Sequence, residues 1–110
     1  MQCETLKAVG NIEEICQTPG LDCIFIGTAD LSQDMGCFGD NNNNELQVVI
    51  NKVLDTCKKY NIVPGIVAGT AEDAVKRIQQ GFQFVTIMND LGFFRSQTKN
   101  EIDTVRKKLH

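Results

Sequence analysis

Apolar residues along this chain follow two different periods. Short continuous apolar runs lie at about 22–27, 62–67 and 82–88, and each is bounded by turn residues. Runs of this length predict strands that are buried on both faces. Between the first two runs, residues of about 45–60 place their apolar side chains three or four positions apart. That spacing predicts an amphipathic helix with one face towards a core.

Weaker signals predict the remaining elements. Residues 1–5 indicate the last part of a strand, and Asn11 is a suitable cap for a short apolar helix. Residues 33–44 predict a long loop, whose four consecutive asparagines, 41–44, suit a solvated tip. Two more helices are expected. One is capped by Thr70 and turns Ala71, Ala74, Val75 and Ile78 inward, and the last covers about 98–109.

The resulting order is a strand followed by a helix, four times over. Strands that alternate with helices predict an α/β fold with parallel pairing and right-handed crossovers. Four such units make either a small open sheet or half of a (β/α)8 barrel, which needs about 250 residues when complete.

Two acidic residues follow the first two predicted strands. Glu4 ends the first extended piece, and Asp30 comes just after the strand that closes at Gly27. Ligands in α/β proteins bind at the carboxyl ends of parallel strands, and two carboxylates there suit a hard divalent cation. Taken singly, Glu4 also fits a solvated terminal residue and Asp30 fits a helix or turn cap.

Composition narrows the class of protein. The chain has 110 residues, 42% of them hydrophobic, with a formal net charge of −3. We therefore expect one globular domain without a nucleic-acid footprint, and no apolar stretch reaches the roughly 20 residues that span a bilayer. The first residues do not form a secretory signal, so we expect a cytoplasmic location with no membrane partner. The five cysteines form no CxxC pair and predict reduced structural thiols.

Two motifs resemble one family. The segment QCET followed by LKAVGNIEEI resembles the Q-[IV]-E-[ST]…A…N…I segment of the HpcH/HpaI aldolase/citrate lyase family. The segment IFIGTADLSQDMG resembles that family's F-I-G-P-A-D-L-S…G segment. The later segments ELQVVI, PGIVAG, GFQFVTI and NDLGFF keep the family's order, so the resemblance runs from Gln2 to about Phe94.

The resemblance implies a fold and an activity. Family members are β/α barrels that act as metal-dependent class II aldolases on pyruvate-like keto acids. Residues 1–110 would form a single partial barrel domain, the C-terminal half, with the N-terminal half absent. By resemblance, Glu4 and Asp30 hold Mg²⁺ or Mn²⁺, with Co²⁺ as a further option. Gln2 lies near the keto oxygen, the backbone of Ala29 and Asp30 holds the substrate carboxylate, and Val67 lines the pocket.

The chain also departs from the family pattern. Thr28 stands where proline is usual, and the asparagine run replaces a Gly/His/Pro-containing loop. The family's general-base histidine and substrate arginine come from the first half of the barrel, so we assign no catalytic acid or base here. We therefore expect an aldol-type lyase, acting on a keto acid and an aldehyde, whose isolated half is inactive or weak.

Two alternatives remain beside this reading. The chain could be a non-catalytic half barrel that binds a full-length relative, because open strand edges invite pairing. It could also be an unrelated open-sheet module of receiver type, although the acidic cluster and lysine of that class are missing. Family members often form oligomers that exchange the last helix, so the resemblance implies a homo-oligomer or pairing with an N-terminal half barrel.

Overall fold

Four parallel strands form the sheet at the centre of the molecule. The computed structural model describes residues 1–110, with β1 at Gln2–Cys3, β2 at Cys23–Ile26, β3 at Val63–Ala68 and β4 at Phe84–Ile87. The strands lie in the order β1-β2-β3-β4, and each pairs in parallel with the next one along the chain. This is the sequential order that successive βα units produce, so the predicted topology is confirmed.

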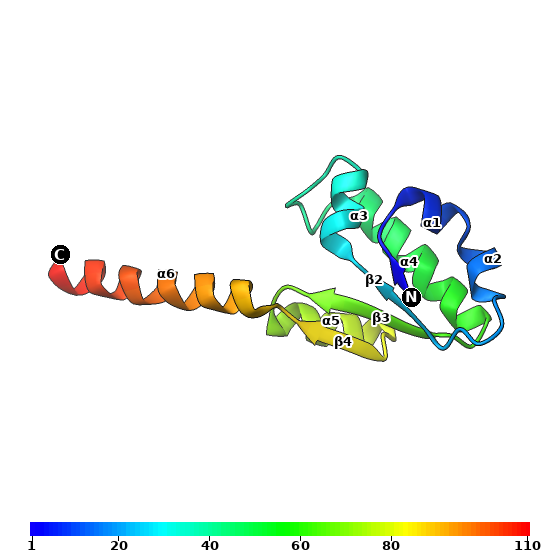
Figure 1. Cartoon of the computed structure of the whole chain (residues 1–110). Helices are drawn as coiled ribbons and strands as arrows, with labels where there is room; N and C mark the ends of the chain where they lie inside the picture. Colours follow the sequence, from blue (N-terminus) through cyan, green and yellow to red (C-terminus); the bar gives the residue numbers. More distant parts are fainter.

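Helices α1 to α5 connect the strands and cover one face of the sheet, whereas α6 follows the last strand (Figure 1). Their bounds are α1 Leu6–Gly10, α2 Ile12–Cys16, α3 Thr28–Asp34, α4 Asn44–Lys59, α5 Ala71–Gln80 and α6 Asp90–Leu109. The core lies between this layer and the sheet. It contains Cys3, Val9, Ile12, Cys16, Ile24, Ile26, Leu31, Leu46, Ile50, Val53, Leu54, Cys57, Ile66 and Phe82.

The opposite face of the sheet carries no helix, so the prediction of strands buried on both faces is wrong for β2 and β4. Along β2, Ile24 and Ile26 are fully buried on the helix side, whereas Phe25 between them points to the bare face and is half-buried. Its ring lies 5.4 Å from the ring of Phe84, which is 50% exposed. Gly65 sits between these two rings in the strand register. An apolar sheet face of this kind is the interior of a barrel when further strands close it.

The last helix extends away from the sheet (Figure 1). None of its residues is buried, and the molecule as a whole measures 59 × 26 × 21 Å. Several large apolar side chains of α6 face solvent, namely Leu91, Phe93, Phe94, Ile102, Val105 and Leu109. No helix of the chain combines the length and the apolar character that a membrane crossing requires.

Several element boundaries differ from the sequence prediction. Residues 28–34 form α3, although the sequence predicts a loop from residue 33, and Thr5 caps an additional short helix, α1, by accepting from the Ala8 N–H. The strand expected at residues 1–5 is confined to Gln2–Cys3. Helix α6 begins at Asp90 and not near 98, because Asn89 caps it by accepting from the Gly92 N–H.

One prediction about side chains was also wrong. On α5 the buried residues are Ala74 and Arg77. Ala71, Val75 and Ile78 are exposed, the last two at 54% and 58%, because no neighbouring element covers them. The asparagine run is exposed at Asn41, Asn42 and Asn44, as predicted, but it also takes part in local hydrogen bonds. Asn43 caps α4 by accepting from the Glu45 and Leu46 N–H groups, and the Asn41 carbonyl accepts from the Gln47 side chain.

Candidate functional site

The two acidic residues predicted as metal ligands lie in one hollow. Glu4 directly follows β1, and Asp30 stands in the first turn of α3, four residues after the end of β2. Because β1 and β2 are parallel neighbours, both residues reach the same edge of the sheet. They line an open hollow of about 420 Å³ together with Thr5, Gln33 and Asp34. The predicted convergence of Glu4 and Asp30 on one rim therefore agrees with the structure.

Gly27 makes room for Glu4. A Cβ atom at position 27 would lie 2.9 Å from Cγ of Glu4 and 3.4 Å from its Cδ and Oε1 atoms. The φ angle of Gly27 is −85°, so its backbone does not itself require glycine. The Gly27 N–H also donates to the Cys3 carbonyl at 3.1 Å, which joins the ends of β1 and β2. The glycine thus serves the close approach of the carboxylate to the chain.

A third carboxylate in the hollow has a structural role. Oδ2 of Asp34 accepts a hydrogen bond of 2.7 Å from the Leu6 N–H, which caps the start of α1. No hydrogen bond or ion pair within the chain engages the side chains of Glu4 or Asp30. The sequence interpretation missed Asp34. Asp34 follows Asp30 by four residues, and residues four apart lie on the same face of a helix, so the prediction of a helix at α3 would have placed both carboxylates together.

The hollow suits a cation that is held by only two protein carboxylates. Carboxylate oxygens are the ligands that Mg²⁺ and Mn²⁺ prefer. No group of three or more Asp, Glu, His or Cys side chains is placed to hold an ion. Mg²⁺ usually binds through one or two carboxylates and keeps several waters, so two ligands are chemically sufficient.

Of the residues predicted to bind substrate, Asp30 lies in the hollow of Glu4, and the other three lie in two other hollows. Ala29 and Val67 line a more enclosed pocket of about 170 Å³, formed at the carboxyl ends of β2, β3 and β4. Gln2 lies on the bare sheet face, where it lines a separate hollow with Phe25 and Phe84. Gln2 is thus not part of the hollow of Glu4 and Asp30, although it shares their strand pair.

The cysteines offer no activated nucleophile in the core. All five are free, and Cys3, Cys16 and Cys57 are buried. Burial raises the pKa of all three thiols, in the case of Cys57 to about 12, with a further contribution from the neighbouring Cys16 thiol. A thiol with a raised pKa stays protonated near neutral pH and is a poor nucleophile. The prediction of free structural thiols holds for these three residues.

The family profile described as HpcH/HpaI aldolase/citrate lyase matches residues 1–97. The chain belongs to this family. Among solved structures, it is similar to an HpcH/HpaI aldolase/citrate lyase family protein from Burkholderia cenocepacia, with a TM-score of 0.86 and 30% identity. That similarity covers 96% of this chain and 41% of the other. An HpcH/HpaI aldolase from Desulfitobacterium hafniense shares the fold, with a TM-score of 0.87 at 24% identity.

Comparison with curated relatives gives similar coverage. A 5-keto-4-deoxy-D-glucarate aldolase from Shigella boydii is 34% identical over 107 residues, which are 97% of this chain and 42% of that protein. A 2-dehydro-3,6-dideoxy-6-sulfogluconate aldolase from Pseudomonas putida is 34% identical over 102 residues, 93% of this chain and 40% of that protein. The chain thus spans about 42% of the length of such relatives. Its four βα units correspond to the C-terminal half of a (β/α)8 barrel.

Proposed function

We propose that this chain carries the ion- and keto-acid-binding part of a carbon–carbon lyase that performs retro-aldol cleavage. The observation that carries the proposal is the meeting of Glu4 and Asp30 in one hollow at the carboxyl edge of the sheet. Relatives across 93–97% of the chain are aldolases. The products would be pyruvate or a similar keto acid and an aldehyde.

Each residue of the site has a defined task in this proposal. Glu4 and Asp30 would hold the divalent ion, Mg²⁺ or Mn²⁺ or alternatively Co²⁺, and Gly27 leaves the space that the Glu4 side chain occupies. When bound, the ion supplies Lewis acidity to the oxygens of the keto acid. The backbone of Ala29 and Asp30 would hold the substrate carboxylate, because N–H groups in the first turn of a helix lack intrahelical partners.

Two further side chains complete the proposed substrate contacts. Val67 would pack against the aldehyde part from its place in the neighbouring pocket. Gln2 would approach the keto oxygen from the bare sheet face, which requires a substrate that reaches across the edge of the sheet. We assign no general acid or base to this chain, so the isolated chain is expected to bind ion and keto acid with little or no turnover.

The binding part of the proposal is tested with Mn²⁺. Calorimetric titration should show that the wild-type chain binds Mn²⁺ and that pyruvate or oxalate strengthens this binding. The Glu4→Gln and Asp30→Asn variants should each lose most of it. Asp22→Asn is the matched control, because it removes one exposed negative charge away from the hollow. Equal Mn²⁺ affinity in all four proteins would refute the site.

The catalytic part of the proposal needs the other half of the barrel. We expect Mn²⁺-dependent release of pyruvate from a 4-hydroxy-2-oxo acid once an N-terminal half barrel from a relative is joined to, or mixed with, this chain. The Glu4→Gln variant in the same assembly is the control and should release none. Pyruvate release that is unaffected by Glu4→Gln and by chelation would contradict the assignment.

A second candidate role is that of an assembly partner, and the exposed apolar surfaces favour it. Covering the exposed apolar surfaces would stabilise the chain. These surfaces are the bare sheet face with Phe25 and Phe84, the open edges of β1 and β4, and the apolar side chains of α6. We propose that they are covered in a homo-oligomer or by an N-terminal half barrel. Light scattering after size-exclusion chromatography should give a mass above that of a monomer for the chain alone, or a 1:1 complex with the half barrel.

A further inference from the structure

The side chain of Asp34 holds the turn that follows Glu4. Its Oδ2 atom accepts from the Leu6 N–H at 2.7 Å, although the two residues are 28 positions apart in the chain. Leu6 is the first residue of α1, so this bond satisfies one of the N–H groups that a helix start leaves without an intrahelical partner. The bond therefore links the end of α3 to the turn between β1 and α1.

The backbone around Glu4 is fixed on both sides. On one side, Cys3 pairs with β2, and its carbonyl accepts from the Gly27 N–H at 3.1 Å. On the other side stands the hydrogen bond between Leu6 and Asp34. Loss of either anchor would let the turn shift and carry the Glu4 carboxylate away from the hollow.

Helix α3 gives Asp34 a firm base. Leu31 is fully buried in the core and Ser32 is only 1% exposed, so one face of α3 is packed against the body. Asp30 and Asp34 are four residues apart, which places them together on the face that borders the hollow. One helix thus presents a proposed ion ligand and, one turn later, the residue that holds the turn beside the other ligand.

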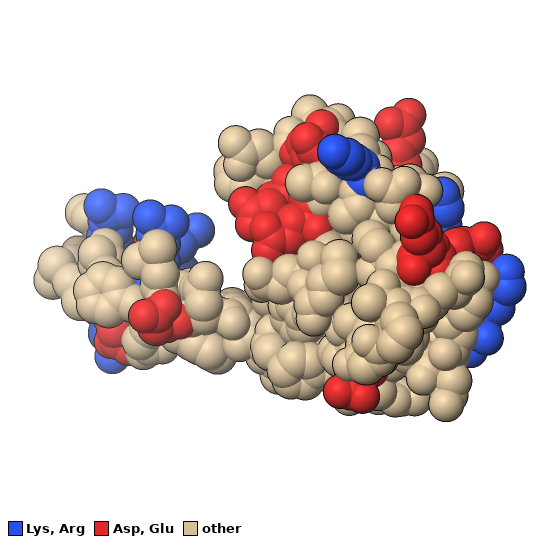
Figure 2. Space-filling model, turned by 45° about the vertical axis from the view of Figure 1, so that its right-hand side comes forward, with Lys and Arg blue, Asp and Glu red and all other residues tan.

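The contacts of Asp34 suit a positioning role and not a third ion ligand. One of its two oxygens is taken by the Leu6 N–H, and no three acidic, histidine or cysteine side chains are placed to hold one ion. No lysine or arginine lines the hollow, so the charge of Asp34 adds to the attraction for a cation. Figure 2 shows that acidic side chains also gather without basic neighbours on one face of the body. Asp34 therefore offers two separable effects, a hydrogen bond and a charge.

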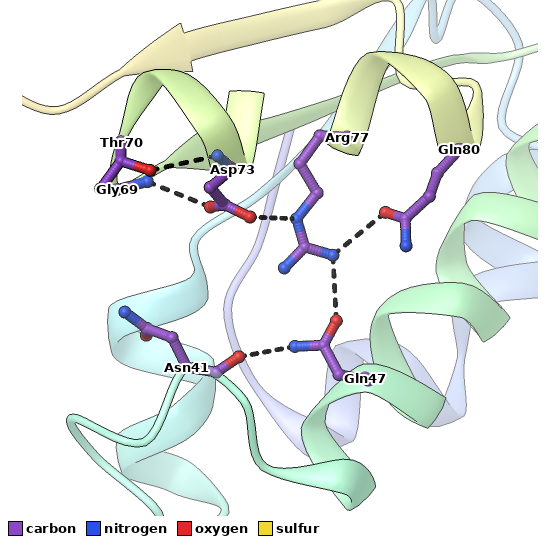
Figure 3. Close-up of polar contacts among 7 residues, drawn as sticks. All are labelled: Asn41, Gln47, Gly69, Thr70, Asp73, Arg77 and Gln80. Carbon is purple, nitrogen blue, oxygen red and sulfur yellow. Dashed lines mark hydrogen bonds and ion pairs between the residues drawn. The ribbon is translucent and has the colours of Figure 1, made fainter. Parts of the chain in front are cut away.

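A second carboxylate of the chain makes a similar bond in a local form. Oδ2 of Asp73 accepts from the Gly69 N–H at 3.1 Å, just after β3, as Figure 3 shows. Asp73 belongs to the helix that directly follows, and its other oxygen lies 3.3 Å from Nε of Arg77. Asp34 instead reaches the preceding βα unit and has no basic partner. It therefore couples two neighbouring units, the ones whose carboxylates share the hollow.

We propose that Asp34 is a positioning residue for the divalent ion and acts by fixing Glu4 through the Leu6 N–H. The inference rests on the proposed ion site and adds a residue that touches neither the ion nor the substrate. Loss of the hydrogen bond should weaken ion binding roughly 10- to 100-fold, the range for residues that orient a metal ligand. Loss of the charge alone, with the bond kept, should weaken it by about fivefold at most.

Two substitutions at position 34 separate the bond from the charge. Asp34→Asn keeps an acceptor for the Leu6 N–H and removes the charge, whereas Asp34→Ala removes both. With a chelator present, amide hydrogen exchange at Leu6 should be faster in Asp34→Ala than in the wild type and in Asp34→Asn. Calorimetric titration with Mn²⁺ should place Asp34→Asn within about fivefold of the wild type and show a loss of roughly 10- to 100-fold for Asp34→Ala. Asp22→Ala, which removes an exposed carboxylate away from the hollow, is the matched control and should bind as the wild type does.

A substitution at the donor tests the same bond from the other side. Leu6 is 45% exposed and stands at the first position of α1, where proline is tolerated because its missing N–H would have no intrahelical partner. Thr5 before it has an extended backbone, with φ −133° and ψ 153°, which a following proline accepts. Leu6→Pro should therefore fold and lose Mn²⁺ affinity by itself, also in the case that Asp34→Ala fails to fold. In the Leu6→Pro background, Asp34→Ala should add no more than the effect of the charge, about fivefold.

Three results would overturn the role of Asp34. They are equal Mn²⁺ affinity of Asp34→Asn and Asp34→Ala, unchanged exchange at the Leu6 amide in Asp34→Ala, and wild-type Mn²⁺ affinity of Leu6→Pro. If Glu4→Gln loses Mn²⁺ binding while Asp34→Ala binds as the wild type does, this inference alone fails. If Glu4→Gln also binds as the wild type does, the proposed ion site fails and the inference fails with it.

Discussion

Replacing Gly27 by alanine tests how the fold positions Glu4. The new Cβ would lie 2.9 Å from Cγ of Glu4, about 0.6 Å closer than the ~3.5 Å at which two carbons normally meet. Cγ lies near the base of the side chain, so rotation of the outer bonds does not relieve the contact. Glu4 must change its χ1 angle, and its carboxylate then leaves the hollow that it shares with Asp30.

The expected effect is on ion binding more than on stability. The φ angle of −85° is accessible to alanine, so the unfolding free energy should change by less than about 1 kcal/mol. Misplacing one of two ligands should weaken Mn²⁺ binding roughly 10- to 100-fold, the range seen when residues supporting a ligand are lost.

Calorimetry with Mn²⁺ and urea unfolding of the same samples give both quantities. Gly69→Ala is the matched control, because an added Cβ there meets nothing within 4 Å. Unchanged Mn²⁺ affinity in Gly27→Ala, at unchanged stability, would refute the role of Glu4. A large loss of stability would instead show that the backbone at position 27 cannot accept a side chain.

Three further predictions concern stability. Gly65→Ala places a Cβ 2.8 Å from Cδ2 of Phe25 and 3.2 Å from the Phe84 carbonyl, so urea unfolding should show a loss of about 1–3 kcal/mol. Asn43→Ala removes the cap of α4 and should cost about 1 kcal/mol, while Asn43→Asp, which keeps the acceptor, should cost less. The pKa of Cys57, raised by burial from its ordinary 9.0 to about 12, predicts pH-dependent stability. As the pH rises, the thiol ionises in the unfolded state before it does so in the folded state. The stability that the protonated, buried thiol contributes is therefore complete below pH 9 and declines towards pH 12, by up to about 1.4 kcal/mol per pH unit. The Cys57→Ala protein should lack this pH-dependent part of the unfolding free energy.

Each of these has an outcome that contradicts it. A Gly65→Ala protein as stable as the wild type would mean that the two rings separate freely. Equal losses for Asn43→Ala and Asn43→Asp would show that the cap contributes nothing. If the unfolding free energy of the wild type and of Cys57→Ala depended on pH in the same way, the pKa of the Cys57 thiol would not be raised by folding.

The order and type of most elements followed from the sequence alone. The apolar runs of β2, β3 and β4 and the stripe of α4 are local patterns, which a sequence displays directly. Burial on both faces of the strands did not follow, because one face of the sheet is bare and Phe84 and Ile87 of β4 are 50% and 45% exposed. Their alternation implied a parallel sheet, and the placement of Glu4 and Asp30 after neighbouring strands implied a shared rim. The structure agrees with both inferences.

Tertiary packing decided what local patterns do not encode. Which residues of α5 are buried depends on the elements that lie beside this helix, and these bury Arg77 but leave Val75 and Ile78 exposed. The hydrogen-bond partner of Arg77, Gln47, is 30 residues away in the chain. The contact between Gly27 and Glu4 arises because the strand register brings separate segments together. Folding also places Gln2 and Glu4 in different hollows, although they are two residues apart in the chain. Gln2 lies on the bare face of the sheet and Glu4 lies at its edge, and these surfaces are separate only once the sheet has formed.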